Sequence, residues 1–253
     1  MSALKRYIPL PVRIRLRQES FFGCAECGNP ILDYHHIIPW AEKHHNDPAH
    51  MVALCPTHHR EIGKRQRAYA YELKKQPYNK MHGKFRGTLY TEKEKPSFIM
   101  GTNTFIKTPI ILSFYDQALI KYRIDQGQSL ISVFLPDADY WPEIEIIDND
   151  IVANGNAFWD IQFSTNYLRL RKRKGESFLE IDLRGEDAKV AGNFIVGGEN
   201  FMFSPQATNF AGVKISNSRV ENCGTGFAYG SSKLRLIRPN YAMLKPEHFF
   251  SLK

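Results

Sequence analysis

The sequence has no long apolar run and few cysteines. None of its apolar runs approaches the about 20 residues that a transmembrane helix needs. Its first residues lead into a stretch rich in proline and arginine instead of an apolar segment, so we expect no secretory signal. Cysteine occurs only 4 times in 253 residues, and three of these cysteines lie close together, which excludes a disulfide framework. We therefore expect a cytoplasmic protein without a membrane partner.

Acidic residues are also scarce in the first part of the chain. Residues 1–97 contain 17 Lys and Arg against 9 Asp and Glu, whereas residues 98–253 contain 17 of each kind. The whole net charge of +8 therefore lies in the first part. A basic module beside a neutral one favours a polyanionic partner such as DNA, although excess charge also serves solubility alone. The overall composition, 43% hydrophobic and 24% charged, excludes a disordered chain, a collagen and a coiled-coil rod.

Two regions of different character divide the chain. We expect an α+β fold in which residues 1–77 form one module, residues 78–97 form a linker and residues 98–253 form an all-β domain. In the last region, short segments rich in Ile, Val, Phe and Tyr alternate with Gly, Asn, Asp and Pro, which predicts strands joined by turns. Both a β-sandwich and a short β-helix fit this pattern. Target recognition, regulation and oligomerisation are all possible roles for this domain.

Local patterns predict individual elements. The run from Pro56 to Lys75 contains Gly63 as its one glycine among helix-forming residues, which predicts a single helix ended by Pro77. Later in the chain, Lys174-Gly175 lies between two strand-like segments and predicts a hairpin turn. Residues 212–230 alternate strand-like and turn-like segments, as a coil of a β-solenoid does.

Cysteine and histidine gather in one short segment. Cys24 and Cys27 form a C-x2-C pair, and Cys55 and His58 follow at the same spacing. Two such pairs provide four ligands, which suits a closed, tetrahedral structural Zn²⁺ site. The alternative is that Cys24 and Cys27 are small buried residues without a metal. Two matched pairs in one short segment favour zinc.

The segment from Cys24 to Arg60 resembles the HNH endonucleases, whose fold is also called ββα-metal. The resemblance covers roughly the first third of the chain. It is carried by three motifs, which are Cys24-x2-Cys27, Asp33-Tyr34-His35-His36-Ile37-Ile38-Pro39 and His50-Met51-Val52-Ala53-Leu54-Cys55-Pro56-Thr57-His58-His59. It implies a ββα-metal module supported by a Cys3His zinc knuckle, and it implies nuclease activity.

The same resemblance implies a role for each of the other histidines. His36 would be the general base that activates water, and His35 and His59 would hold the catalytic metal ion. The middle residue of the family motif is usually asparagine, but this chain has His50 there. His50 would hold the loop and orient the base, because an imidazole can donate a hydrogen bond to a carbonyl. Asn46 competes for this role but lies too close to His36 for the family spacing.

Physical chemistry supports this division of roles. Adjacent residues on a strand point to opposite faces, so His35 and His36 would divide between metal and substrate. His58 and His59 lie about 100° apart on a helix, so one can face the zinc and the other the catalytic ion. A histidine with a pKa of about 6.5 is a suitable base at neutral pH. We expect Mg²⁺ or Mn²⁺ as the catalytic ion, although two imidazole ligands also suit Ni²⁺ or Zn²⁺.

Basic and aromatic residues near the motif have roles that their chemistry suggests. Three basic residues follow the motif, and these are Lys64, Arg65 and Arg67. We expect them to bind the phosphate backbone of DNA, and the alternative is that they form a solvent-exposed face. His44 and His45 are expected to be exposed loop residues, and the alternative is that they contact DNA or metal. Trp40 is expected to pack in the core.

The leading hypothesis is a metal-dependent endonuclease that cuts DNA, for example in restriction or phage defence. A double-strand break needs two active sites, so a homodimer or a protein partner is expected. The first alternative is a zinc module that has lost catalysis and binds nucleic acid or protein, which the unusual His50 favours. A second alternative makes the β domain a ligand sensor with cleavage as its output.

Overall fold

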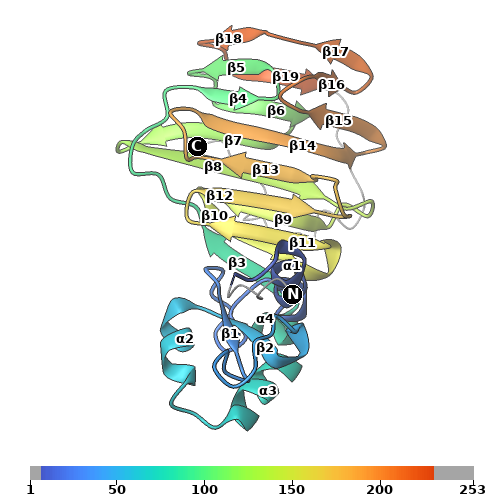
Figure 1. Cartoon of the computed structure of the whole chain (residues 1–253). Helices are drawn as coiled ribbons and strands as arrows, with labels where there is room; N and C mark the ends of the chain where they lie inside the picture. The colour runs from blue at the N-terminus through green and yellow to red at the C-terminus, as the bar shows by residue number, and fades with distance from the viewer. Residues whose placement is uncertain (1–6, 231–253) are drawn as a thin grey trace. The chain divides into compact units, whose positions relative to one another are not determined.

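The computed structural model describes residues 7–230 and divides into two compact units. The first unit contains residues up to Leu89 together with Asp150–Glu180, and the second contains Tyr90–Asn149 together with residues from Ile181 onward. Residues 1–6 and 231–253, at the ends of the two predicted domains, lie outside the described residues. The N-terminal region has helices and a small sheet, and the rest is largely β, with open sheets (Figure 1). This agrees with the predicted fold class.

The N-terminal region is built around a two-stranded antiparallel sheet. Strand β1 pairs with strand β2, and the register places His35 opposite Val52 and His36 opposite Met51. The elements of this region are α1 (Leu10–Glu19), β1 (Asp33–His36), η1 (Pro48–His50), β2 (Met51–Leu54), α2 (Pro56–Ile62), α3 (Arg67–Lys75) and α4 (Tyr78–His82). All four residues of β2 are buried, so this strand forms the centre of the small core.

The prediction of a single helix from Pro56 to Lys75 is wrong, because this segment forms two helices. Helix α2 ends at Ile62 and helix α3 begins at Arg67. The N–H of Arg65 bonds the carbonyl of Ile62 at 3.0 Å, which tightens the chain into a turn, and Gln66 then takes an extended conformation. The break allows Ile62 and Ala70 to enter the same apolar core.

The predicted linker contains regular structure. Helix α4 and strand β3 (Lys84–Thr88) lie within residues 78–97. Strand β3 pairs antiparallel with β10 (Asp150–Asn154) inside the first unit. The domain boundaries themselves stay a prediction. The first unit also contains η2 (Gly155–Ala157), β11 (Asp160–Ser164) and β12 (Tyr167–Arg171), and β11 pairs antiparallel with β12.

The hairpin turn predicted at Lys174-Gly175 is confirmed. Gly175 adopts a φ of +82°, a left-handed conformation that glycine takes without strain. Arg173 and Glu176 form an antiparallel bridge on either side of the turn. The chain then enters β13 (Leu179–Asp182).

Two sets of strands make up the second unit. In one set, each strand pairs antiparallel with the next along the chain, and its strands are β6 (Ile110–Phe114), β7 (Gln117–Asp125), β8 (Gln128–Pro136) and β9 (Pro142–Ile147). The other contains β4 (Phe98–Met100), β5 (Asn103–Ile106), β14 (Ala188–Val196), β15 (Glu199–Phe203), β16 (Thr208–Phe210) and β17 (Val213–Ile215). Aromatic side chains pack between the sets: the rings of Phe114 and Phe201 lie 6.1 Å apart and those of Phe98 and Tyr122 lie 5.1 Å apart.

The last two described strands stack in parallel on earlier ones. Strand β18 (Arg219–Glu221) pairs with β5, and β19 (Thr225–Tyr229) pairs with β6. The segment that contains β18 and β19 thus follows the path of the segment that contains β5 and β6. This is the stacking that the solenoid-like pattern of residues 212–230 indicated. The sheets are open, and the predicted alternatives of sandwich and β-helix each describe only part of this arrangement.

Candidate metal and catalytic site

The four predicted zinc ligands come together in space. The ligand atoms of Cys24, Cys27, Cys55 and His58 all lie within 4.8 Å of one another. The sulfurs of Cys27 and Cys55 are 3.9 Å apart, and His58 Nδ1 lies 3.4 Å from the sulfurs of Cys24 and of Cys55. Zn–S bonds of about 2.3 Å place two sulfurs of a tetrahedron about 3.8 Å apart, so the cluster is consistent with structural zinc.

The surroundings of this cluster suit a cation. Burial raises the pKa of the Cys24 thiol, and burial raises the pKa of Cys27 to about 12. A thiol with so high a pKa ionises at neutral pH only when a metal ion stabilises the thiolate. On the other side of the His58 ring, Nε2 lies 3.8 Å from a carboxylate oxygen of Glu26. A carboxylate behind a ligating histidine orients the ring and raises its basicity.

Helix α4 supports the loop that carries Cys24 and Cys27. The buried side chain of Asn79 donates to the carbonyls of Phe21 at 3.2 Å and Gly28 at 3.4 Å. Gly28 has a φ of +76°, and a Cβ there would lie 2.4 Å from Asn79 Oδ1. Glycine is therefore required at this position for both its conformation and its size. Residues predicted to be a linker thus shape the metal cluster.

A cleft of about 470 Å³ lies beside the cluster and contains three of the predicted catalytic histidines. His35 and His36 reach it from β1, and His59 reaches it from α2. The rings of His35 and His59 lie 5.4 Å apart. Burial, followed by the proximity of His59 and His36, lowers the pKa of His35 to about 4. His35 is therefore neutral at pH 7, the form in which an imidazole binds a metal.

His36 is held by the backbone of the loop that follows β1. Its Nε2 lies 3.0 Å from the carbonyl oxygen of His45. A carbonyl only accepts, so Nε2 carries the hydrogen and donates it. In the neutral ring, Nδ1 then carries the lone pair and can accept a proton. The edge of the ring also packs against Trp40, at 5.5 Å between centroids.

His45 is the site residue that the sequence reasoning missed. It was expected to be exposed, but it is 6% exposed and bonds the backbone at both ring nitrogens. Only His44 is exposed as expected, and it stacks on Trp40. Trp40 itself is half-buried and lines the cleft instead of packing in the core. No local spacing signal distinguishes the two adjacent loop histidines.

His50 occupies a different place from the other histidines. Within residues 7–230, the lining of the cleft does not include His50. Its Nδ1 lies 2.8 Å from the hydroxyl of Tyr71 on α3. Its backbone carbonyl accepts from the N–H of Ile37 at 2.9 Å, which joins the two ends of the loop. The loop-holding contact is therefore made by the His50 backbone, while its side chain faces Tyr71. The predicted orienting role of that side chain stays a prediction.

Two of the three predicted phosphate-binding cations line the cleft. These are Arg65 and Arg67, whereas Lys64 is exposed and lies outside the lining. Each arginine pairs with an acidic residue. Arg65 lies 3.5 Å from Glu26, the same carboxylate that faces His58, and Arg67 pairs with Glu42. Arg65 also packs over the ring of Tyr69 at 4.5 Å, which holds the guanidinium in one place.

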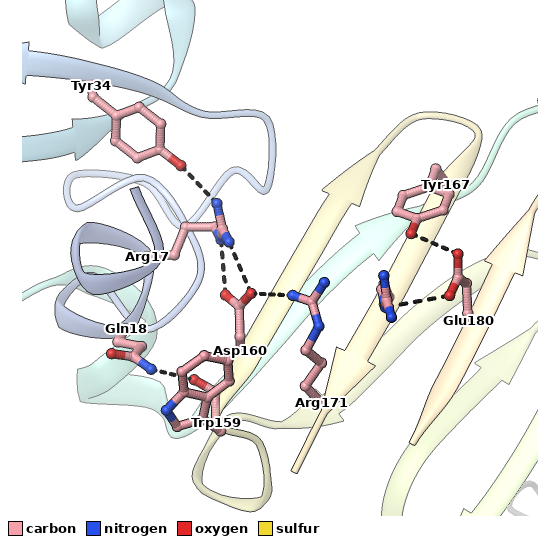
Figure 2. Close-up of polar contacts among 9 residues, drawn as sticks. Arg17, Gln18, Tyr34, Trp159, Asp160, Tyr167, Arg171 and Glu180 are labelled. Carbon is pink, nitrogen blue, oxygen red and sulfur yellow. Dashed lines mark hydrogen bonds and ion pairs between the residues drawn. The ribbon is translucent and has the colours of Figure 1, made fainter. Parts of the chain in front are cut away.

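A buried ion-pair network anchors the strand that carries His35. Figure 2 shows Arg17 of α1 donating twice to Asp160 of β11, at 2.9 Å each, and once to the hydroxyl of Tyr34 at 3.2 Å. Arg171 adds a further bond to Asp160 at 2.8 Å. The pKa of Arg17 is raised because bonds to Asp160 and Tyr34 outweigh the effect of burial. Tyr34 precedes His35 on β1, so the network holds the strand beside the cleft.

The alternating arginines of β12 are also paired. Arg169 lies 3.3 Å from Glu180, which accepts a bond from the Tyr167 hydroxyl at 2.8 Å, and Arg171 is bonded to Asp160 (Figure 2). Burial raises the pKa of Tyr167 to about 12. These arginines neutralise acidic partners within the first unit.

Comparison with known proteins agrees with this geometry. The sequence model of the HNH endonuclease family matches residues 24–65, so the chain contains an HNH endonuclease domain there. The family is generally one of nucleases that use a divalent metal and act on nucleic acid. No curated protein and no solved structure matches the chain. No helix within residues 7–230 has the length and apolar character to cross a membrane.

Proposed function

We propose that the chain is a metal-dependent endonuclease that hydrolyses DNA phosphodiester bonds. The observation that supports this most directly is the cleft in which His35, His36 and His59 meet, next to the Cys3His cluster. The rings of His35 and His59 lie 5.4 Å apart, and these two imidazoles would hold one divalent ion, Mg²⁺ or Mn²⁺. When bound there, such an ion supplies a positive charge that stabilises the departing oxygen of the phosphodiester.

His36 is the general base of the proposed reaction. Because its Nε2–H donates to the carbonyl of His45, its Nδ1 has the lone pair that removes a proton from water. The water oxygen then forms a bond to phosphorus, and the bond from phosphorus to a sugar oxygen breaks. His35 and His36 are adjacent on β1 and both line the cleft, so the proposed ligand and the proposed base lie in the same cavity.

Arg65 and Arg67 provide the phosphate contacts in this proposal. Both line the cleft, and each can exchange a carboxylate partner for a phosphate oxygen when DNA enters. Lys64 adds charge at the surface outside the cleft. A site of this kind cuts one strand, so cutting both strands requires a homodimer or a protein partner. Restriction and phage defence are settings that suit such an enzyme.

The test is cleavage of supercoiled plasmid by the full chain with Mg²⁺, Mn²⁺ or Ni²⁺, and with EDTA as the blank. We expect nicking that requires the divalent ion, and we expect His36→Ala to lower its rate by about 10²–10⁴-fold, because a general base contributes that much. His82→Ala is the matched control, since His82 is an exposed histidine on α4 that bonds the carbonyl of Tyr78.

The cleavage results distinguish a nuclease from a module without catalytic activity. Cleavage by the wild type that survives His36→Ala would contradict the proposed role of His36. A wild-type chain that binds DNA but cuts it with none of the three ions would favour the alternative, a zinc module that binds nucleic acid without catalysis. His50, which stands where the family usually has asparagine, is the observation that keeps this alternative open.

A further inference from the structure

We propose that His45 is a positioning residue for the proposed nuclease reaction: its imidazole fixes the loop carbonyl that holds His36 as the Nε2–H tautomer. The inference rests on the proposed function and goes further, since it assigns a role to a residue outside the HNH motif. His45 does not touch the reacting atoms. It acts through the bond from His36 Nε2 to its own backbone carbonyl, 3.0 Å long.

The tautomer of His45 follows from its backbone partners. The N–H of Asp47 points at Nδ1 of His45, at 3.1 Å, and an N–H can only donate. Nδ1 therefore has no hydrogen in the neutral ring, and the hydrogen is on Nε2. That Nε2–H donates to the carbonyl of Ile38 at 3.0 Å. Both nitrogens of a buried ring are thus matched to a donor and an acceptor of the backbone.

These two bonds join the beginning of the loop to its end. Ile38 lies just after β1, and Asp47 lies just before η1, where its side chain accepts from the N–H of Ala49 at 2.9 Å. The His45 ring therefore holds the intervening chain in one path. The carbonyl of the same residue points at His36 as a consequence. Without the ring, the carbonyl remains but nothing in its own residue keeps it in place.

The neighbouring rings hold His45 from both sides. Its centroid lies 5.2 Å from that of His36 and 6.0 Å from that of His50, and both pairs are edge to face. His50 is in turn bonded to Tyr71. The side chain at the usual asparagine position thus faces α3, and the side chain of His45 adds two bonds to the one that the His50 backbone makes across the loop. The bond between His36 and the loop then depends on His45 more than on the side chain of His50.

Three variants of the full chain separate the bond from His45 to the carbonyl of Ile38 from the bond that His45 accepts from the N–H of Asp47. His45→Leu removes both and keeps apolar bulk in a buried position. His45→Gln places an amide nitrogen near the position of Nε2 and keeps the donor to Ile38, whereas His45→Asn places an oxygen near Nδ1 and keeps only the acceptor for Asp47. His44→Leu is the matched control, because it changes the adjacent, exposed histidine.

Two measurements apply to each variant. The first is kcat and KM on an oligonucleotide with Mn²⁺. The second is the ¹⁵N–¹H imidazole correlation spectrum of His36, which reports its tautomer without any cleavage. We expect His45→Leu to lower kcat by about 10–100-fold with KM nearly unchanged, which is the usual effect of losing a residue that orients a catalytic group. His45→Gln should recover most of the loss and His45→Asn less of it, and His44→Leu should resemble the wild type.

The spectra decide the inference independently of the proposed function. We expect His36 to be the Nε2–H tautomer in the wild type and a mixture of both tautomers in His45→Leu. Unchanged His36 signals in that variant would overturn the inference, whatever happens to kcat, and so would a loss confined to KM. If His45→Leu does not fold, a His36 tautomer that differs between the Gln and Asn variants supports the inference, and identical spectra overturn it. If the wild type cuts nothing, the proposed function fails, and the spectra still give this answer.

Discussion

The HNH domain and the second unit are stabilised by different interactions. The buried apolar core around the cysteines of the HNH domain consists of small and medium side chains such as Ala25 and Val52, and two tyrosines of α3 pack against it partly buried. In the second unit, large side chains such as Phe105 and Phe201 are fully buried. Burial of large apolar side chains stabilises a domain without help, whereas a core as small as the first usually requires a metal. The cleft that contains His35, His36 and His59 is thus part of the region whose stability depends more on polar contacts.

The charged side chains show the same contrast. In the first unit, Arg17 and Asp160 form a bidentate pair with almost no exposure to solvent. In the second unit, Arg123 pairs with Asp125 and Asp148, and all three side chains are about half exposed. Exposed pairs contribute little to stability, but loss of one partner of a buried pair leaves a buried charge. Removal of one partner of these ion pairs should therefore lower the stability of the first unit more than that of the second.

Removal of the metal should have the largest effect on this contrast. We expect Cys27→Ser, or a strong chelator, to unfold the HNH domain and leave the second unit folded, because structural zinc contributes on the order of 10 kcal/mol to domains of this kind. The measurement is zinc content by mass spectrometry together with hydrogen exchange resolved by peptide. Cys223→Ser is the control, since this exposed cysteine lies outside the cluster. Slow exchange across residues 24–65 in zinc-free protein would show that the apolar core is sufficient.

The buried ion pair should have the next largest effect. We expect Arg17→Met to lower the free energy of unfolding by about 3 kcal/mol, because Asp160 keeps Arg171 but loses its bidentate partner. The matched control is Arg184→Met, which removes an exposed partner of Asp182 and should cost at most about 1 kcal/mol. Urea unfolding of the full chain, with hydrogen exchange resolved by peptide in both units, measures the two effects. Equal effects of the two variants would remove the distinction between buried and exposed pairs.

A conservative core change in the second unit should have the smallest effect. Ile144 on β9 is fully buried, and we expect Ile144→Val to cost about 1 kcal/mol in the second unit, the usual effect of one buried methylene group. Zinc content and exchange in the HNH domain should not change. A loss of zinc in this variant would mean that the two regions are coupled in stability, against the comparison made above.

Local spacing was sufficient to predict the Cys3His cluster and the HNH domain. Cys24, Cys27, Cys55 and His58 occur as two pairs of equal spacing, and a knuckle or a helical turn brings each pair together wherever the chain goes next. The strand and helix positions of His35 and His59 follow from similar local rules. The helix break after Ile62 was not predicted, because a single glycine is compatible with a helix and the buried contact of Ala70 is not local.

The sequence by itself determined which candidate groups this chain carries: two cysteine and histidine pairs of equal spacing, three histidines for a cleft and a basic first part. The tertiary structure alone decided which of two adjacent histidines is buried. His45 bonds the carbonyl of Ile38 and the N–H of Asp47, and sequence does not single these groups out, because every residue has a carbonyl and every residue except proline has an N–H. The tertiary structure also decided that Arg17 meets Asp160, 143 residues later in the chain. Contacts between residues so far apart depend on the folded path of the backbone, which residue spacing does not encode.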